Sequence, residues 1–158
     1  MNKRELIQQW REARRVLFDS LKALGEGEAS IPNSIGKWSV KDVVAHIVFW
    51  DEELLRGMKA LLKRDRPAFL DRDWDELNAR AVAERKHQSL NEMLGDLKES
   101  GARIEVFLNG LDESEFCSCM GQKWKMWDVT IEWIVCGNVE HDKHHTQKIL
   151  TWRNGHLK

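Results

Sequence analysis

Four long segments of this chain repeat apolar residues every three or four positions, the spacing that places them on one face of an α-helix. These segments run from Lys3 to Leu24, from Ser39 to about Leu62, from Ser89 to Asn109 and from about Asp128 to Arg153. Because the 158 residues include 2 prolines, little in the sequence interrupts helix formation. No pair of segments shows the alternation expected of paired strands, so the pattern predicts an all-α protein.

The segments between the long helices predict how those helices are connected. Ser39–Asp42 and Ser89–Glu92 have the form of capping boxes, which mark the starts of the second and third long helices. The polar stretch 63–73 is typical of a crossover, and residues 74–86 are expected to form a short accessory helix. The chain is therefore predicted to be a single domain, residues 1–158, built as a four-helix bundle with one accessory helix between helices 2 and 3.

Charge and cysteine content exclude several classes of protein. Lys and Arg total 25 and Asp and Glu total 26, a formal net charge of -1, which argues against a nucleic-acid-binding protein. No apolar run approaches the length that a membrane-spanning helix needs. Cys117, Cys119 and Cys136 are an odd and sparse set that does not form a disulfide framework, so we expect reduced thiols and a cytoplasmic location.

Three histidines interrupt apolar faces that are expected to point into the bundle. His141 and His145 are four residues apart on the last predicted helix, and His46 interrupts the second helix in the same way. Three imidazoles can hold one divalent cation and leave a fourth position free for water or substrate, as in catalytic zinc sites. The alternative is that the His-x-x-x-His pair is incidental and that His46 is a hydrogen-bonded core residue.

Three stretches of the chain resemble the DinB-like superfamily. Residues 36–50 resemble its second-helix signature, and residues 140–147 resemble its last-helix His-x-x-x-His-x-Gln motif. Residues 74–78 resemble the accessory segment of the ClbS/DfsB-like branch, in which some members lack the histidines. The resemblance implies an up-down-down-up bundle with a metal in its pocket, often zinc or nickel.

On this resemblance, the metal ligands would be His46, His141 and His145. Family members with known roles include thiol S-transferases, which use a low-molecular-weight thiol, and hydrolase-like or protective proteins. A cation held by three neutral imidazoles also lowers the pKa of a bound water or thiol. We therefore expect a metal-dependent enzyme, thiol S-transferase-like or hydrolase-like, that acts on a small electrophilic molecule. One alternative is a protein that binds and sequesters a small molecule without turnover, and another is a helical partner module with core histidines.

Several other side chains are candidates for a role at this site. Asn138, Glu53 and Asp42 lie at helical spacings from the histidines and could orient a ligand imidazole, although Asp42 also fits a helix cap. Trp38 and Trp50 flank His46 and are the best candidates for pocket walls. Helix faces rich in Trp and Leu also make a homodimer plausible.

Overall fold

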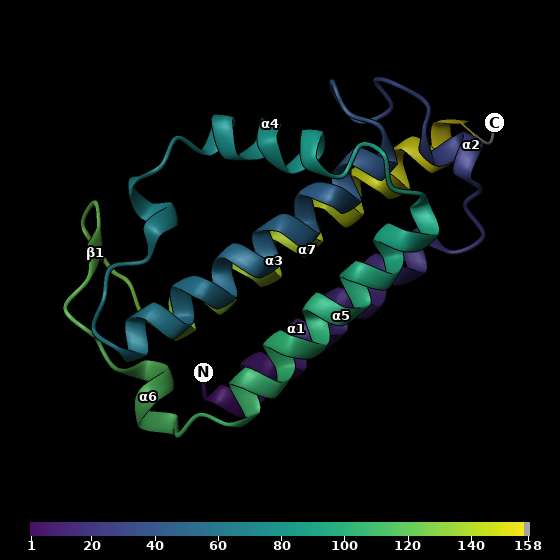
Figure 1. The fold of residues 1–158 in the computed structure, drawn as a ribbon. Helices are drawn as coiled ribbons and strands as arrows, with labels where there is room; N and C mark the ends of the chain where they lie inside the picture. The colour runs from purple at the N-terminus through teal and green to yellow at the C-terminus, as the bar shows by residue number, and fades with distance from the viewer. Residues whose placement is uncertain (157–158) are drawn as a thin grey trace.

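The chain folds as an all-α protein built around four long helices, as the apolar repeats predict. The computed structural model describes residues 1–156 and has the long helices α1 (Lys3–Leu21), α3 (Val40–Leu62), α5 (Leu90–Asn109) and α7 (Ile131–His156). α1 lies against α7 and α3 lies against α5, while α3 also contacts α7. α1 and α7 run in one direction and α3 and α5 in the other, which is the up-down-down-up order (Figure 1).

The starts of the long helices lie where local hydrogen bonding fixes them. Ser39 Oγ accepts from the Asp42 backbone N–H at 3.1 Å, and the Asp42 carboxylate accepts from the Ser39 N–H at 3.0 Å. Ser89 and Glu92 form the same reciprocal pair at the start of α5. Both predicted capping boxes are therefore confirmed, and the first one fixes where α3 begins, one and a half turns before His46.

Short elements connect the long helices. They are α2 (Glu26–Ala29), the 3₁₀ helix η1 (Ala68–Asp71), α4 (Trp74–Glu84), α6 (Glu113–Cys117), and the strands β1 (Lys123–Trp124) and β2 (Trp127–Asp128). η1 and α4 occupy the crossover between α3 and α5, where the accessory helix is predicted. α4 runs along the outside of the bundle beside α3 (Figure 1).

Three expectations, one about strands and two about helix boundaries, are wrong for local reasons. β1 and β2 pair as an antiparallel hairpin, although no strand pair is predicted, because strands of two residues are too short to show an alternating pattern. Asp128 belongs to this hairpin and makes an ion pair with Lys123, so α7 begins at Ile131 and not near Asp128. The first helix ends at Leu21, before Leu24, because Ala23 has a φ of 58°.

The apolar core fills the space between the four long helices in two clusters. One cluster lies toward the end of the bundle that α6 covers, and the other lies toward the end where α3 begins. Gly57 brings the crossover close to α3, because a Cβ at this position would lie 2.6 Å from a ring carbon of Phe69. In the described part of the chain, no helix is both long enough and apolar enough to cross a lipid bilayer.

Candidate metal centre

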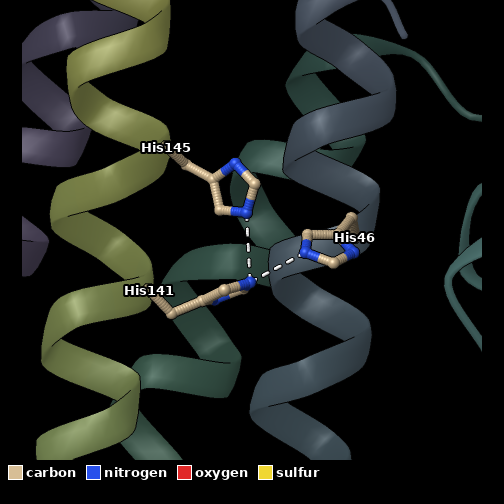
Figure 2. A group of neighbouring side chains, drawn as sticks. All are labelled: His46, His141 and His145. Carbon is tan, nitrogen blue, oxygen red and sulfur yellow. Dashed lines mark hydrogen bonds between the residues drawn. The ribbon is translucent and has the colours of Figure 1, made fainter. Parts of the chain in front are cut away.

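The three histidines singled out in the sequence meet between α3 and α7. His46 Nε2 lies 2.7 Å from His141 Nε2, and His145 Nε2 lies 3.1 Å from the same atom (Figure 2). His141 and His145 are one helical turn apart on α7, and His46 reaches toward them from α3. The structure thus brings together two histidines of α7 and one of α3, as the sequence predicts.

Burial keeps these imidazoles uncharged. Burial lowers the pKa of His46 to about 3, helped by repulsion from His145 and partly offset by the Asn78 side chain. Burial also lowers the pKa of His141 and of His145 to about 3, and in each case repulsion from a second triad imidazole adds to the effect. At neutral pH, all three rings therefore present lone pairs and not positive charges, which is the form that binds a metal.

The ring nitrogens of the triad have too few partners within the protein. The Nδ1 atoms of His46, His141 and His145 are buried and meet no hydrogen-bond partner among the described residues. A neutral imidazole carries one N–H, so the Nε2 atoms can share few protons with one another. Buried polar atoms are normally paired, and this cluster therefore departs from what a purely structural core requires.

The donor set fits a divalent cation. The candidate ligand atoms of the three histidines all lie within 4.8 Å of one another. Tetrahedral coordination with Zn–N bonds of about 2.0–2.1 Å would separate the ligand nitrogens by roughly 3.4 Å, so small ring movements would suffice. Imidazole nitrogen suits zinc and nickel, and three protein ligands leave a coordination position for another molecule.

The three candidates for orienting the imidazoles contact other partners. Asp42 forms the capping box of α3, and Glu53 makes an ion pair with Arg56. Asn138 Oδ1 accepts from Trp10 Nε1 at 2.6 Å. In the described structure, none of the three makes a hydrogen bond to the triad.

A cavity of about 410 Å³ opens beside the triad. The expected wall residues Trp38 and Trp50 both line it, and the Trp38 and His46 ring centroids are 4.9 Å apart. Trp74 from α4 and Trp133 from α7 also line it. The crossover thus contributes a wall of the cavity, and this placement depends on how α4 folds back over α3.

A second polar cluster, which the sequence did not predict, is buried at the centre of the bundle. Arg14 donates to Asp142 Oδ2 through Nε at 2.8 Å and to Asp51 through both terminal nitrogens at 2.7 and 2.8 Å. Ser100 Oγ donates to Asp51 at 2.6 Å, and Asn138 Nδ2 lies 3.5 Å from Asp51 Oδ1. The cluster joins α1, α3, α5 and α7, and Asp142 follows His141 directly in α7.

The positive charge of Arg14 and the carboxylates of Asp51 and Asp142 stabilise one another. Burial alone would lower the pKa of Arg14, but Asp51 and Asp142 together raise it, so the guanidinium stays charged. Burial raises the pKa of Asp142 to about 6, and Arg14 partly offsets this effect. One sequence signal could have revealed the cluster, since Arg14 lies four residues after Trp10 and three before Leu17, on the edge of the apolar face of α1.

Solved structures share this fold over almost the whole chain. A protein of Streptococcus pneumoniae superposes with a TM-score of 0.83 and 19% identity, covering 98% of this chain and 91% of its own. The colibactin self-resistance protein ClbS, solved in complex with double-stranded DNA, has a TM-score of 0.81 and 18% identity, with 97% and 96% covered. The sibling lethal factor precursor DfsB has a TM-score of 0.82 and 15% identity, with 99% and 97% covered.

No curated protein sequence matches this chain. The family model of the DinB superfamily, by contrast, matches residues 9–149, which is most of the sequence. This match agrees with the resemblance found in the sequence and with the ClbS and DfsB structures. The chain therefore belongs to the DinB superfamily.

Proposed function

We propose that His46, His141 and His145 bind a divalent cation, zinc or nickel, and that the protein is an enzyme acting on a small electrophilic molecule. The observation that carries this proposal is the meeting of three uncharged imidazoles from two helices, two of them buried and His141 partly buried, beside a cavity. An apolar core gains nothing from three imidazoles whose Nε2 atoms meet at 2.7 and 3.1 Å with too few protons to pair them, whereas a cation would use all three lone pairs. The predicted core-histidine alternative is less well supported for that reason.

A divalent cation at this position would supply Lewis acidity, which lowers the pKa of a water or small thiol in contact with it. The chain's own residues would position the reactants. The tryptophans that line the cavity limit the access of water, and the neutral histidines keep lone pairs available at neutral pH. Thiol transfer and hydrolysis are both compatible with this arrangement, and they differ in whether a low-molecular-weight thiol is consumed.

Metal stoichiometry tests the proposed site. We expect untagged protein, dialysed against Zn²⁺ or Ni²⁺ and then desalted, to retain one ion per chain by elemental analysis. His46→Ala, His141→Ala and His145→Ala should each lose the ion, whereas the control His87→Ala, at an exposed position outside the triad, should retain it. Wild-type protein without a stoichiometric ion, or undiminished binding in His46→Ala, would contradict the site.

Turnover tests the enzymatic part of the proposal. Model electrophiles, an activated aryl halide and an activated ester, should be assayed with and without a small thiol. We expect multiple turnovers that stop on chelation and return when Zn²⁺ or Ni²⁺ is restored. Thiol-dependent loss of the halide would indicate S-transfer, and thiol-independent ester cleavage would indicate hydrolysis. Activity that persists unchanged after complete metal removal would reject the proposed mechanism.

Protective binding without turnover is the second candidate function. The similar structure of ClbS is that of a colibactin self-resistance protein, which favours a protective role. A sequestering protein would bind one molecule per site and release it unchanged. Mass spectrometry of the recovered ligand after several equivalents have been added separates this outcome from catalysis.

The ClbS structure also contains double-stranded DNA, so DNA binding should be measured for this chain. The formal charge of -1 predicts weak binding without a steep dependence on salt. Fluorescence anisotropy with a labelled duplex at two salt concentrations would show this. The homodimer and the cytoplasmic location stay predictions, and light scattering measures the first of them.

A further inference from the structure

We propose that the cavity beside the triad selects a flat, uncharged, conjugated molecule, and that Asn78 holds a carbonyl oxygen of that molecule. This inference rests on the proposed function for what happens to the molecule, but the binding itself follows from the cavity walls. It narrows the expected substrate from any small electrophile to a flat molecule whose part against the cavity walls is uncharged.

The absence of charge in the cavity is the first step of the argument. No Lys, Arg, Asp or Glu is among the described residues that line it, and the polar lining consists of the histidines, Asn78 and Asn138. A carboxylate or phosphate that entered would lose water without gaining a cationic partner from the walls. An uncharged molecule pays no such penalty, so the walls discriminate against anionic ligands.

Two of the tryptophans in the wall, Trp50 and Trp74, present ring surfaces and not donors. Trp50 Nε1 already donates to Asn78 Oδ1 at 2.7 Å, and Trp74 Nε1 already donates to the Phe69 carbonyl at 2.8 Å. With these N–H groups used, the two indoles offer mainly their π faces to a ligand.

Contacts outside the cavity hold this aromatic wall in place. Trp74 is stacked on Trp124, with ring centroids 5.3 Å apart and an interplanar angle of 8°. Trp50 meets Trp74 edge to face, with centroids 5.7 Å apart. A wall fixed in this way loses little conformational freedom when a ligand binds, which favours a rigid, flat molecule.

Asn78 supplies the polar contact. Since an indole N–H can only donate, its bond to Trp50 requires Asn78 Oδ1 to face Trp50, which directs the Nδ2 donors elsewhere. No described residue accepts a hydrogen bond from Asn78 Nδ2, and Asn78 lies near enough to His46 to affect its pKa. Because Asn78 lines the cavity, a carbonyl oxygen of a ligand there is the partner that we assign to Nδ2.

One stretch of the wall is open because it has no side chain. Gly137 lines the cavity, one turn before His141, and a Cβ built there meets no atom within 4 Å. Gly95, on α5, also has open space at its Cβ but does not line the cavity. These two glycines make a matched pair for filling the cavity without disturbing the fold.

Three probes that share one carbon skeleton distinguish the effect of ligand shape on binding from the effect of ligand charge. 2-Naphthamide is flat and neutral, 2-naphthoate is flat and anionic, and decahydro-2-naphthamide is neutral but not flat. Titration calorimetry with the full-length, chelator-treated protein measures the walls alone, because a carboxylate could otherwise bind the cation. We expect 2-naphthamide to bind at least about tenfold more tightly than either of the other two. Equal or tighter binding of 2-naphthoate, or of the saturated amide, would overturn the inference.

Substitutions inside and outside the cavity test which residues are responsible for binding 2-naphthamide. Trp74→Ala should weaken 2-naphthamide binding about threefold to tenfold. Trp152→Ala, which removes a tryptophan outside the cavity, should not weaken it. Gly137→Leu should abolish binding and Gly95→Leu should not. Unchanged binding in Trp74→Ala and Gly137→Leu together would place the ligand elsewhere and overturn the assignment.

Asn78→Asp tests the hydrogen bond separately from the structural role of Asn78. This change keeps an acceptor for Trp50 Nε1 but removes the Nδ2 donors. If Nδ2 holds the carbonyl, affinity for 2-naphthamide falls about threefold to tenfold. If Asn78 acts only by holding Trp50, Asn78→Asp binds like wild type, and that part of the inference is wrong.

The result of the probe-binding test does not depend on whether the triad binds a metal ion. Selective binding of 2-naphthamide by a protein that never retains Zn²⁺ or Ni²⁺ would support the cavity and reject the proposed function. A protein that retains one ion per chain but binds the three probes equally when chelated would do the reverse.

Discussion

The two polar clusters buried in this bundle differ in whether their atoms are satisfied. Arg14, Asp51 and Asp142 exchange four hydrogen bonds, and no atom of theirs is among the buried unpaired atoms of the described residues. One residue away on α7, His141 belongs to a cluster whose three Nε2 atoms face one another with too few protons to pair them, and whose Nδ1 atoms have no partner among the described residues. A satisfied cluster needs nothing from outside, whereas an unsatisfied one points to a ligand. We therefore assign the Arg14 cluster to the stability of the fold and propose the histidine triad as the ligand site.

The largest expected effect comes from breaking the satisfied cluster. Arg14→Met leaves two buried carboxylates without their cation, and we expect the free energy of unfolding to fall by about 3–5 kcal/mol. Urea denaturation measures this change. Arg15→Met is the matched control, because Arg15 is exposed, and its effect should stay within about 0.5 kcal/mol. Similar losses in both variants would show that the central cluster contributes little to stability.

The next effect concerns the unsatisfied cluster and depends on metal. Zn²⁺ at a free concentration of 1,000 times its Kd should stabilise the folded protein by about 4 kcal/mol, because the ion binds the folded state alone. Thermal unfolding with and without Zn²⁺ shows this as a rise in Tm. The rise should vanish in His46→Ala and persist in His87→Ala. A rise of equal size in both variants would mean that the ion binds outside the triad.

The two clusters also differ in how well local sequence patterns predict them. Apolar spacing and capping residues such as Ser39 and Ser89 act locally, so the long helices and their starts could be predicted. His46, His141 and His145 were recognisable because each interrupts an apolar face. The position of Arg14 at the edge of such a face is a weaker signal, because a long charged side chain there usually reaches solvent.

Other features depended on contacts between distant segments. That Asp51 and Asp142 meet around Arg14 follows from the packing of α1 against α3 and α7, which no single helix reveals. The position of Trp74 in the cavity wall depends on the path of the crossover. Asn138 is buried, but its partners Trp10 and Asp51 come from other helices, so helical spacing from the histidines could not identify them.

The pH dependence of stability should also separate the clusters. Folding lowers the three triad pKa values from 6.5 to about 3, so the unfolded chain binds more protons in this range and metal-free stability falls as the pH drops through it. Asp142 acts in the opposite sense, because its pKa rises from 3.8 to about 6 on folding. Three groups against one should give a net uptake of about two protons on unfolding near pH 5.

Urea denaturation of the metal-free protein between pH 7 and pH 4.5 checks this expectation. Replacing all three triad histidines with alanine should remove the loss of stability at acidic pH. If the replaced protein loses stability as steeply as wild type, the acid sensitivity arises from other groups.

The smallest expected effect isolates one hydrogen bond of the satisfied cluster. Ser100→Ala removes the Oγ donor 2.6 Å from Asp51 but leaves both bonds from Arg14 to that carboxylate. Because Asp51 keeps its charged partner, we expect a loss of about 1–2 kcal/mol in urea denaturation, and metal retention should not change. Ser118→Ala, at an exposed serine, serves as the control. Loss of the bound ion in Ser100→Ala would show that the two clusters are coupled through α7, and their separation into structure and function would then be wrong.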